Sequence, residues 1–158
     1  MIHPTAVIYP NVIIEDNVTI GAFCIIGAPP EWKGKEQENK GVIILSGTTI
    51  TGHVTIDGGG LARTIIGRNC YIMKHAHVGH DAILYDNVTL SCGAKIGGHA
   101  EIGEGTNIGL NAVVHQKKVI PPGCMIGMGA VITKGLQMIS GSKYVGNPAK
   151  YLSPNIKP

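Results

Sequence analysis

The 158-residue sequence predicts an all-β fold, a triangular solenoid of stacked coils, from three features of its residue pattern. An aliphatic residue recurs at every sixth position from Ile66 to Ile132, twelve times in succession. A small or β-branched residue stands four positions after most of these aliphatics, as at Cys70 and Ala76, and glycine often follows the aliphatic directly. Neither a helix nor a simple strand has a period of six, whereas a solenoid with three six-residue sides per coil does. We therefore expect the aliphatic side chains inside the prism and the small residues at its corners.

The predicted solenoid domain covers residues 1–140 and is interrupted twice. The period of six begins at Ile2 and is first broken by residues 27–41, which contain prolines, charges and the only Trp of the chain. We expect one coil's worth of chain to loop out there, either to carry binding residues or as a solvated excursion. The second break, residues 58–61, is a Gly-Gly-Gly-Leu run without the Gly-Lys-Ser/Thr of a phosphate-binding loop, so we interpret it as a structural kink. Residues 141–158 leave the repeat, and their prolines predict a short irregular C-terminal tail.

Composition excludes several classes of protein. Hydrophobic residues make up 44% of the chain and charged residues 15%, which is too apolar for a disordered chain. The 23 glycines and the many β-branched residues disfavour a helical bundle. No apolar run reaches the roughly 18 residues of a membrane span, and the N-terminus lacks a secretory signal pattern. We expect no membrane insertion and a cytoplasmic location.

Charge is unevenly distributed along the chain. Residues 105–158 contain six lysines and no acidic residue, which suits an anionic partner such as a phosphate-bearing cofactor or an acidic carrier protein. Nucleic acid is not expected, because this segment has no Arg and few aromatic residues. The four cysteines are too far apart for a C-x-x-C pair and are predicted to be small, reduced core residues.

Histidines gather on one predicted side of the prism. Val78, Ile96 and Val114 are separated by 18 residues each, so they fall on the same side of three successive coils. Four of the seven histidines flank or follow these three positions: His77, His80, His99 and His115. All four lie off the inward positions and are predicted to face outward or into a groove between subunits. A surface of solvated histidines and a shared zinc site are the alternatives.

The pair His80-Asp81 has the composition of a catalytic base and its orienting carboxylate. Gly98 lies 18 residues after His80 and is predicted to stand directly one coil above it. Its backbone N–H, unshielded by a side chain, is suited to stabilising an oxyanion. The pattern therefore indicates a base and an oxyanion donor on adjacent coils.

The segment MKHAHVGHDAILYDNVTLSCGAKIGGHAEIG, followed by AVVHQ, resembles the UDP-N-acetylglucosamine O-acyltransferase family of lipid A synthesis, hexapeptide-repeat transferases with a left-handed parallel β-helix. In that family A-H-x-x-H-D is followed, at the same separations, by G-H and V-H-Q. The matching residues here are Ala76, His77, His80, Asp81, Gly98, His99, Val114, His115 and Gln116.

The resemblance implies a role for each matching residue. It makes His80 the general base, Asp81 its orienting group and Gly98 the oxyanion donor. It places four residues along the substrate groove: His77, His99, His115 and Gln116. Glu31 and Lys33 in the first interruption resemble an acid-x-Lys pair that contacts the acceptor.

The C-terminal part resembles a different branch of the same superfamily. IGMGAVITKG and YVGNPAKYL are similar to the acetyl-CoA-dependent sugar and antibiotic acetyltransferases, which implies that Lys134, Asn147 and Lys150 lie near CoA. The O-acyltransferases continue into a helical domain whose arginines help to hold the nucleotide. This sequence departs from them near Asn155, so uridine specificity stays open.

We predict a homotrimeric acyltransferase that moves an acetyl or other short acyl group from acetyl-CoA or another acyl-CoA to a hydroxyl or amine of a sugar or nucleotide sugar, without a metal. The first alternative is an O-acyltransferase that uses a long-chain acyl carrier protein and UDP-N-acetylglucosamine. A second is a metalloenzyme similar to the γ-carbonic anhydrases, which Tyr85 disfavours because it stands where that family has a ligand histidine. The third is a β-helix with a purely structural role.

Overall fold

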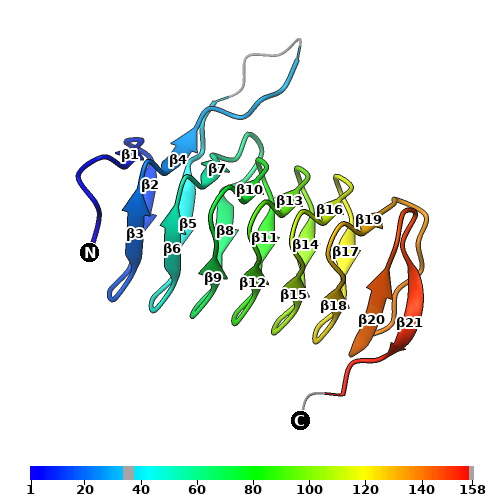
Figure 1. Ribbon diagram of the computed structural model, residues 1–158. Helices are drawn as coiled ribbons and strands as arrows, with labels where there is room; N and C mark the ends of the chain where they lie inside the picture. Colours follow the sequence, from blue (N-terminus) through cyan, green and yellow to red (C-terminus); the bar gives the residue numbers. More distant parts are fainter. Residues whose placement is uncertain (34–37, 157–158) are drawn as a thin grey trace.

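The computed structural model describes residues 1–33 and 38–156, and within them the chain winds into a parallel β-helix with three sheets (Figure 1). Residues 34–37 of the predicted loop and the last two residues of the predicted tail lie outside the described residues. Strands pair in parallel with the equivalent strand of the next coil, so that Ile65 of one coil lies beside Ile83 of the next. The predicted left-handed, triangular β-helix is confirmed.

Each sheet forms one side of the prism. Sheet 1 contains β1 (Val7–Ile8), β4 (Ile25–Ala28), β7 (Thr55–Asp57), β10 (His77–Val78), β13 (Lys95–Ile96), β16 (Val113–Val114) and β19 (Val131–Ile132). Sheet 2 contains β2 (Val12–Ile14), β5 (Val42–Ile44), β8 (Thr64–Ile66), β11 (Ile83–Leu84), β14 (Glu101–Ile102) and β17 (Val119–Ile120). Sheet 3 contains β3 (Thr19–Ala22), β6 (Thr49–Gly52), β9 (Tyr71–Ile72), β12 (Thr89–Leu90), β15 (Asn107–Ile108), β18 (Met125–Ile126), β20 (Ser142–Val145) and β21 (Lys150–Pro154).

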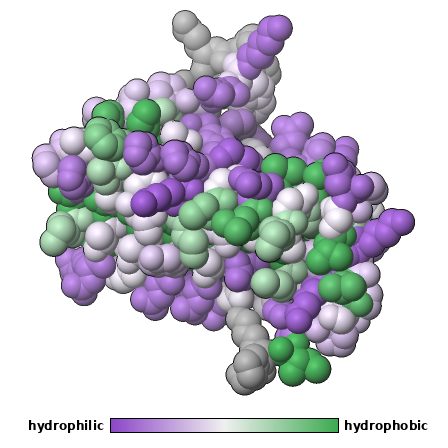
Figure 2. All heavy atoms as spheres, viewed as in Figure 1, coloured by the Kyte–Doolittle hydropathy of each residue, from purple (hydrophilic) through white to green (hydrophobic). Residues whose placement is uncertain are grey.

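The core follows the period of six. The sixth-position aliphatics, such as Ile66, Ile72 and Val78, are completely buried along the axis of the prism. Small residues such as Ala82 and Ala100 are buried at the corners, where the chain turns from one sheet to the next. Side chains of the residues between these positions face outward because successive strand residues point to opposite faces. Hydrophilic and hydrophobic side chains are mixed on the face seen in Figure 2.

Three of the four cysteines match their predicted role, and Cys92, which is only partly buried and lies outside the core, does not. Cys24, Cys70 and Cys124 are buried free thiols, and burial raises the pKa of Cys70 to about 11. A thiol with a raised pKa is a poor nucleophile at neutral pH, so these three residues act as core packing.

Both interruptions occur at the corner between sheet 1 and sheet 2. Between Ile26 and Ile44 the chain advances by one side of the prism, because β4 belongs to sheet 1 and β5 to sheet 2. The expectation that a whole coil loops out there is therefore wrong, and the excursion is an insertion at a corner. The Gly-Gly-Gly-Leu run lies at the same corner one coil later, between β7 and β8.

The C-terminal tail is more regular than predicted. β20 continues sheet 3 beside β18, and β21 folds back antiparallel to it. Tyr144 is buried in this hairpin, where its hydroxyl accepts a hydrogen bond from the backbone N–H of Ile139 at 2.7 Å. Among the described residues, no helix has the length and hydropathy needed to cross a bilayer.

Candidate active site

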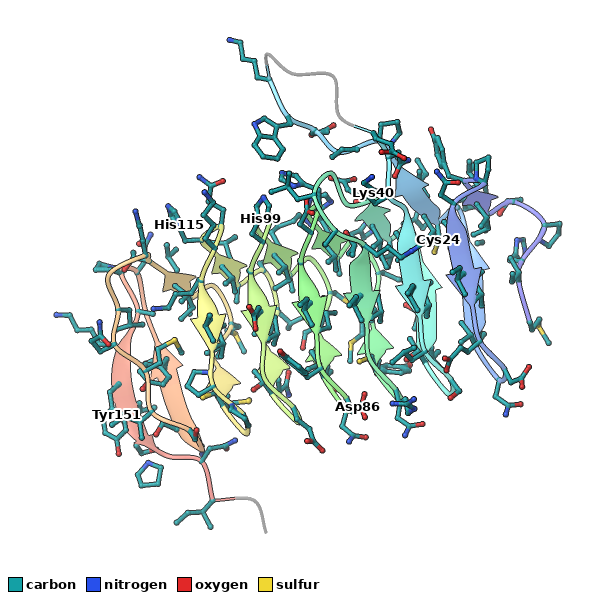
Figure 3. All side chains as sticks on the ribbon, turned by 180° about the vertical axis from the view of Figure 1, so that it is seen from behind. Cys24, Lys40, Asp86, His99, His115 and Tyr151 are labelled. Atoms are coloured by element: carbon teal, nitrogen blue, oxygen red, sulfur yellow. The ribbon has the colours of Figure 1, made fainter. Side chains whose placement is uncertain are left out.

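The candidate site lies at the corner between sheet 1 and sheet 2, directly after β10, β13 and β16. Asp81, His99 and Lys117 occupy equivalent positions in three successive coils, with φ of 59°, 58° and 60°. Asp and His tolerate this left-handed backbone better than most residues. Figure 3 shows His99 and His115 along one edge of the prism. The 18-residue coil thus stacks the chemistry predicted from the sequence along a single edge.

Asp81 is held by four hydrogen bonds. Its Oδ1 accepts from the backbone N–H groups of Leu61 (2.8 Å) and Ala62 (2.7 Å). Its Oδ2 accepts from the N–H of Gly60 (2.9 Å) and from Nδ1 of His80 (2.8 Å). The Gly-Gly-Gly-Leu run is therefore more than a structural kink, because it forms a nest of N–H donors around the carboxylate.

These contacts fix the charge of Asp81 and the tautomer of His80. Burial favours the neutral acid, but the hydrogen bonds from Ala62, Gly60, His80 and Leu61 outweigh it and lower the pKa of Asp81 to about 2. An ionised carboxylate only accepts hydrogen bonds, so the Nδ1 of His80 carries the proton. Nε2 is then the free basic nitrogen of the ring.

Gly98 borders this basic nitrogen. A Cβ atom added at Gly98 would lie 2.8 Å from Nε2 of His80, so glycine is required for the ring to keep its place. Within the part of the chain that the structure describes, the N–H of Gly98 donates to no protein acceptor. A free N–H donor beside a basic nitrogen is the arrangement that the sequence predicted for an oxyanion site.

His99 stands beside the same pair. Its ring is 5.0 Å from that of His80 between centroids, at an angle of 89°, and its Nε2 lies 3.9 Å from Oδ2 of Asp81. Burial lowers the pKa of His99, and the nearby His80 and Lys117 lower it further against the opposing charge of Asp81. His99 is thus favoured as a neutral hydrogen-bonding group near pH 7.

A second imidazole–carboxylate pair adjoins the first. His77 shares a hydrogen bond with Oγ1 of Thr55 at 2.8 Å through Nδ1, and its Nε2 lies 3.8 Å from Oδ2 of Asp57. Burial raises the pKa of Asp57; the charges of His77 and His80 lower it, and that of Glu31 raises it. This pair places a buried acid next to the base.

The excursion supplies one wall of a cleft above the base. The cleft has a volume of about 310 Å³. It is lined by Glu31, Trp32, Lys33, His80, His99, Gln116 and Lys117. Glu31 and Lys33, predicted from a loose resemblance, therefore do lie at the site.

Five other predicted binding residues do not line this cleft, and the first of them is His77, which contacts Thr55 and Asp57 instead. The Nδ1 of exposed His115 donates to the carbonyl of Gln116 at 2.7 Å, and the ring does not line the cleft. Lys134, Asn147 and Lys150 are exposed toward the C-terminal end of the prism and do not line it either. Figure 3 shows Tyr151, the neighbour of Lys150, at that end.

Sequence reasoning missed Trp32, Asp57, Lys117 and the three N–H donors of the nest. The order of the sides offered a signal for the nest. Residues 56–66 and residues 78–84 both run from sheet 1 to sheet 2, in adjacent coils, so the Gly-Gly-Gly-Leu run can be expected beside Asp81. The placement of Trp32 had no such signal, because the excursion does not follow the repeat.

These residues are poorly suited to form a metal-binding site. Ligand atoms of His80, Asp81 and His99 lie within 4.8 Å of one another. However, the two oxygens of Asp81 already accept four hydrogen bonds, so a cation would have to displace backbone donors. Tyr85, which stands where a γ-carbonic-anhydrase-like site requires a ligand histidine, donates its hydroxyl proton to Oε2 of Glu101 at 3.1 Å.

Comparisons with known proteins identify the repeat and the proteins that share the fold. The family described as bacterial transferase hexapeptide (six repeats) matches residues 1–28 and 63–98. An acyl-[acyl-carrier-protein]–UDP-N-acetylglucosamine O-acyltransferase of Campylobacter concisus is 32% identical over 125 residues, covering 77% of this chain and 48% of that protein. The chain spans about half the length of the curated relatives it matches.

Solved structures share the fold. A UDP-N-acetylglucosamine acyltransferase from Bacteroides fragilis is 27% identical with a TM-score of 0.91, covering 98% of this chain and 60% of that one. A GDP-perosamine N-acetyltransferase from Caulobacter crescentus, solved with CoA and GDP-perosamine, shares the fold at 21% identity and a TM-score of 0.56, covering 94% and 57%. The chain therefore carries the bacterial transferase hexapeptide repeat and is similar in sequence and fold to UDP-N-acetylglucosamine O-acyltransferases.

Proposed function

We propose that this chain is an acyltransferase that moves an acyl group from a thioester to a sugar hydroxyl of a UDP-sugar, with His80 as general base. The observation that carries the proposal is the His80–Asp81 pair, anchored by three backbone N–H groups and bordered by Gly98. A purely structural β-helix has no need of a buried, ionised carboxylate aimed at an imidazole. The names of the relatives support both the reaction class and the acceptor.

The proposed reaction needs no covalent enzyme intermediate. The acceptor hydroxyl donates to Nε2 of His80 and loses its proton to that nitrogen as its oxygen forms a bond to the thioester carbonyl carbon. The N–H of Gly98 stabilises the negative charge on the carbonyl oxygen. The C–S bond then breaks, and the proton on Nε2 passes to the leaving sulfur. Asp81 stays ionised throughout and stabilises the imidazolium.

The residues of the cleft suit a polar, anionic acceptor. Lys33 and Lys117 bring positive charge to a space of about 310 Å³ beside the base. Cations of this kind favour a nucleotide diphosphate. Glu31, Gln116 and His99 supply the hydrogen-bonding groups that orient a sugar.

For the donor, an acyl carrier protein is better supported than CoA. The relatives that match most of this chain are named for that donor, and the acid-free, lysine-rich residues 105–158 suit an acidic protein surface. CoA thioesters remain the second candidate, because the same lysines attract phosphates and Lys134, Asn147 and Lys150 are exposed at that end.

The test is a donor panel with UDP-N-acetylglucosamine as acceptor. We expect transfer from an acyl carrier protein thioester that exceeds transfer from acetyl-CoA or longer acyl-CoAs, and that falls with added salt. His80→Ala should lower turnover by roughly 10²–10⁴. The matched control is His53→Ala, because His53 is exposed and packs against Phe23 and His75 away from the cleft. An unchanged rate in His80→Ala, or no product with any donor, would refute the proposal.

A further inference from the structure

The only tryptophan of the chain lies against the proposed base. The rings of Trp32 and His80 are nearly parallel, with centroids 5.4 Å apart and an interplanar angle of 21°. The Trp32 ring meets His99 edge-on, at 5.8 Å and 85°. Three aromatic rings from the excursion and from two successive coils therefore pack together at the mouth of the site.

This contact covers one face of the His80 ring. Asp81 occupies Nδ1, and the backbone of Gly98 lies against the Nε2 end of the ring. With Trp32 against the ring, the side chain of His80 is only 15% exposed. Access of water to the base is therefore limited on the side that faces the cleft.

The environment of Trp32 is otherwise polar. The cleft around it is lined by charged and amide side chains, and Trp32 itself is half-buried, outside the hydrophobic core of the prism. Its backbone N–H donates to the carbonyl of Pro30 at 3.0 Å, which fixes the chain locally. The indole contacts the two imidazoles of the site and no residue of the core, so the role of this contact lies at the site.

We propose that Trp32 is a positioning residue that excludes water from His80 and forms the apolar wall on which the sugar ring of the acceptor packs, an inference that rests on the proposed function. The reaction to be prevented is hydrolysis. If His80 deprotonates water, the water oxygen attacks the thioester carbonyl, the C–S bond breaks, and a free acid and a thiol are released. An apolar shield over the base suppresses this loss until an acceptor displaces the remaining water.

The packing itself is tested by fluorescence, without any activity. Protonated imidazole quenches the emission of an indole in contact with it, and Trp32 is the only source of tryptophan emission. We expect emission to fall as the pH is lowered, and this step to be lost in His80→Asn. The other charged or titratable groups that face His80 are Asp57, Asp81, His99, Glu31, Lys33 and Lys117. His99→Gln removes the second imidazole and should keep the step, whereas an identical pH profile in His80→Asn would overturn the proposal.

The role is tested with Trp32→Leu and Trp32→Phe. Trp32→Leu should raise acceptor-independent thioester hydrolysis and the KM for the UDP-sugar by about two- to tenfold, the range that an aromatic stacking pair contributes, while kcat changes less. Trp32→Phe should keep the hydrolysis rate and the KM close to those of the unsubstituted chain. Tyr71 is an exposed aromatic residue on sheet 3, so Tyr71→Leu should change neither quantity. Transfer by the unsubstituted chain with no change in Trp32→Leu would overturn the shielding role alone. Absence of transfer by the unsubstituted chain would instead overturn the proposed function.

Discussion

Asp81 is the most tightly held side chain of the site. Its carboxylate is 3% exposed and accepts one hydrogen bond from His80 and three from backbone N–H groups. A buried charge is unfavourable unless it is satisfied in this way. The residue therefore serves two functions, because the bonds that hold its charge also join one coil to the next.

This anchoring predicts a pH dependence of stability. The pKa of Asp81 is about 2 in the folded chain, below its ordinary value of about 3.9. Its contribution is therefore complete above about pH 4 and is lost as the pH falls through about 2. The shift of nearly two pKa units corresponds to about 2 kcal/mol. Urea unfolding at several pH values should show this loss in the unsubstituted chain and a smaller loss in Asp81→Asn; equal pH slopes would contradict it.

The sequence predicts some site residues better than others. His80, Asp81, Gly98 and His99 are predictable because the 18-residue coil places them on one edge. The position of Asp57 is not predictable, because the insertion at residues 58–61 changes the 18-residue spacing between its coil and the next. Its nearness to His77 follows from the pairing of Thr55 with His77, which only the fold reveals.

The insertion at residues 58–61 is the element that supports the base. Gly59 directly precedes the three N–H donors of the nest. A Cβ atom at Gly59 would lie 1.5 Å from the carbonyl oxygen of Ala62. Because the contact is with backbone, no change of rotamer relieves it. The geometry of the nest therefore depends on the absence of a side chain at this position.

We predict that Gly59→Ala distorts the nest and lowers turnover by at least about tenfold, since Asp81 then holds His80 less firmly. The matched control is Gly135→Ala, because a Cβ atom at Gly135 meets nothing within 4 Å. Steady-state kinetics of both variants, with circular dichroism to confirm the fold, is the measurement. Equal rates in the two variants would contradict the supporting role.

The elements themselves are predictable wherever the period of six holds. From Ile66 to Ile132 every predicted inward aliphatic is buried, because one pattern fixes both the strand and its neighbour. The pattern is silent where it stops. Tyr144 keeps the 18-residue spacing, because it pairs with Ile126 and is buried, but it is aromatic where the pattern has aliphatic residues, and the antiparallel return of β21 has no counterpart in the repeat.

At the scale of the whole molecule, sheet 2 has an apolar outer face. Its outward column is aliphatic in five of six strands: Ile13, Ile43, Ile65, Ile83 and Val119, with Glu101 as the exception. The equivalent column of sheet 3 is mostly polar and includes Thr19, Thr49, Thr89 and Asn107. This apolar column borders the corner that carries Asp81 and His99. We propose that it packs against further copies of the chain, in the homotrimer expected from the sequence, with one site at each boundary.

The trimer is tested by mass. Light scattering at micromolar concentration should give three times the 16.6 kDa of the chain. Ile83→Lys on sheet 2 should yield monomers and lose transfer activity, because a charge cannot be buried unpaired in the interface. Thr89→Lys, on sheet 3 of the same coil, should leave the mass unchanged. A monomeric mass for the unsubstituted chain would contradict the prediction.

Because each strand of the prism pairs only with the strands of the coils before and after it, the stability of the stack is approximately a sum of nearest-neighbour terms. The site draws on residues 57–62, 77–81, 98–99 and 116–117 of adjacent coils near the middle of the stack, together with residues 31–33 of the excursion. Local unfolding that begins at β1 or β21 must break the strand pairing between several coils before it reaches Asp81. Amide protons should therefore exchange fastest in the outer coils and slowest around the site, so that thermal fraying of either end leaves the catalytic geometry in register.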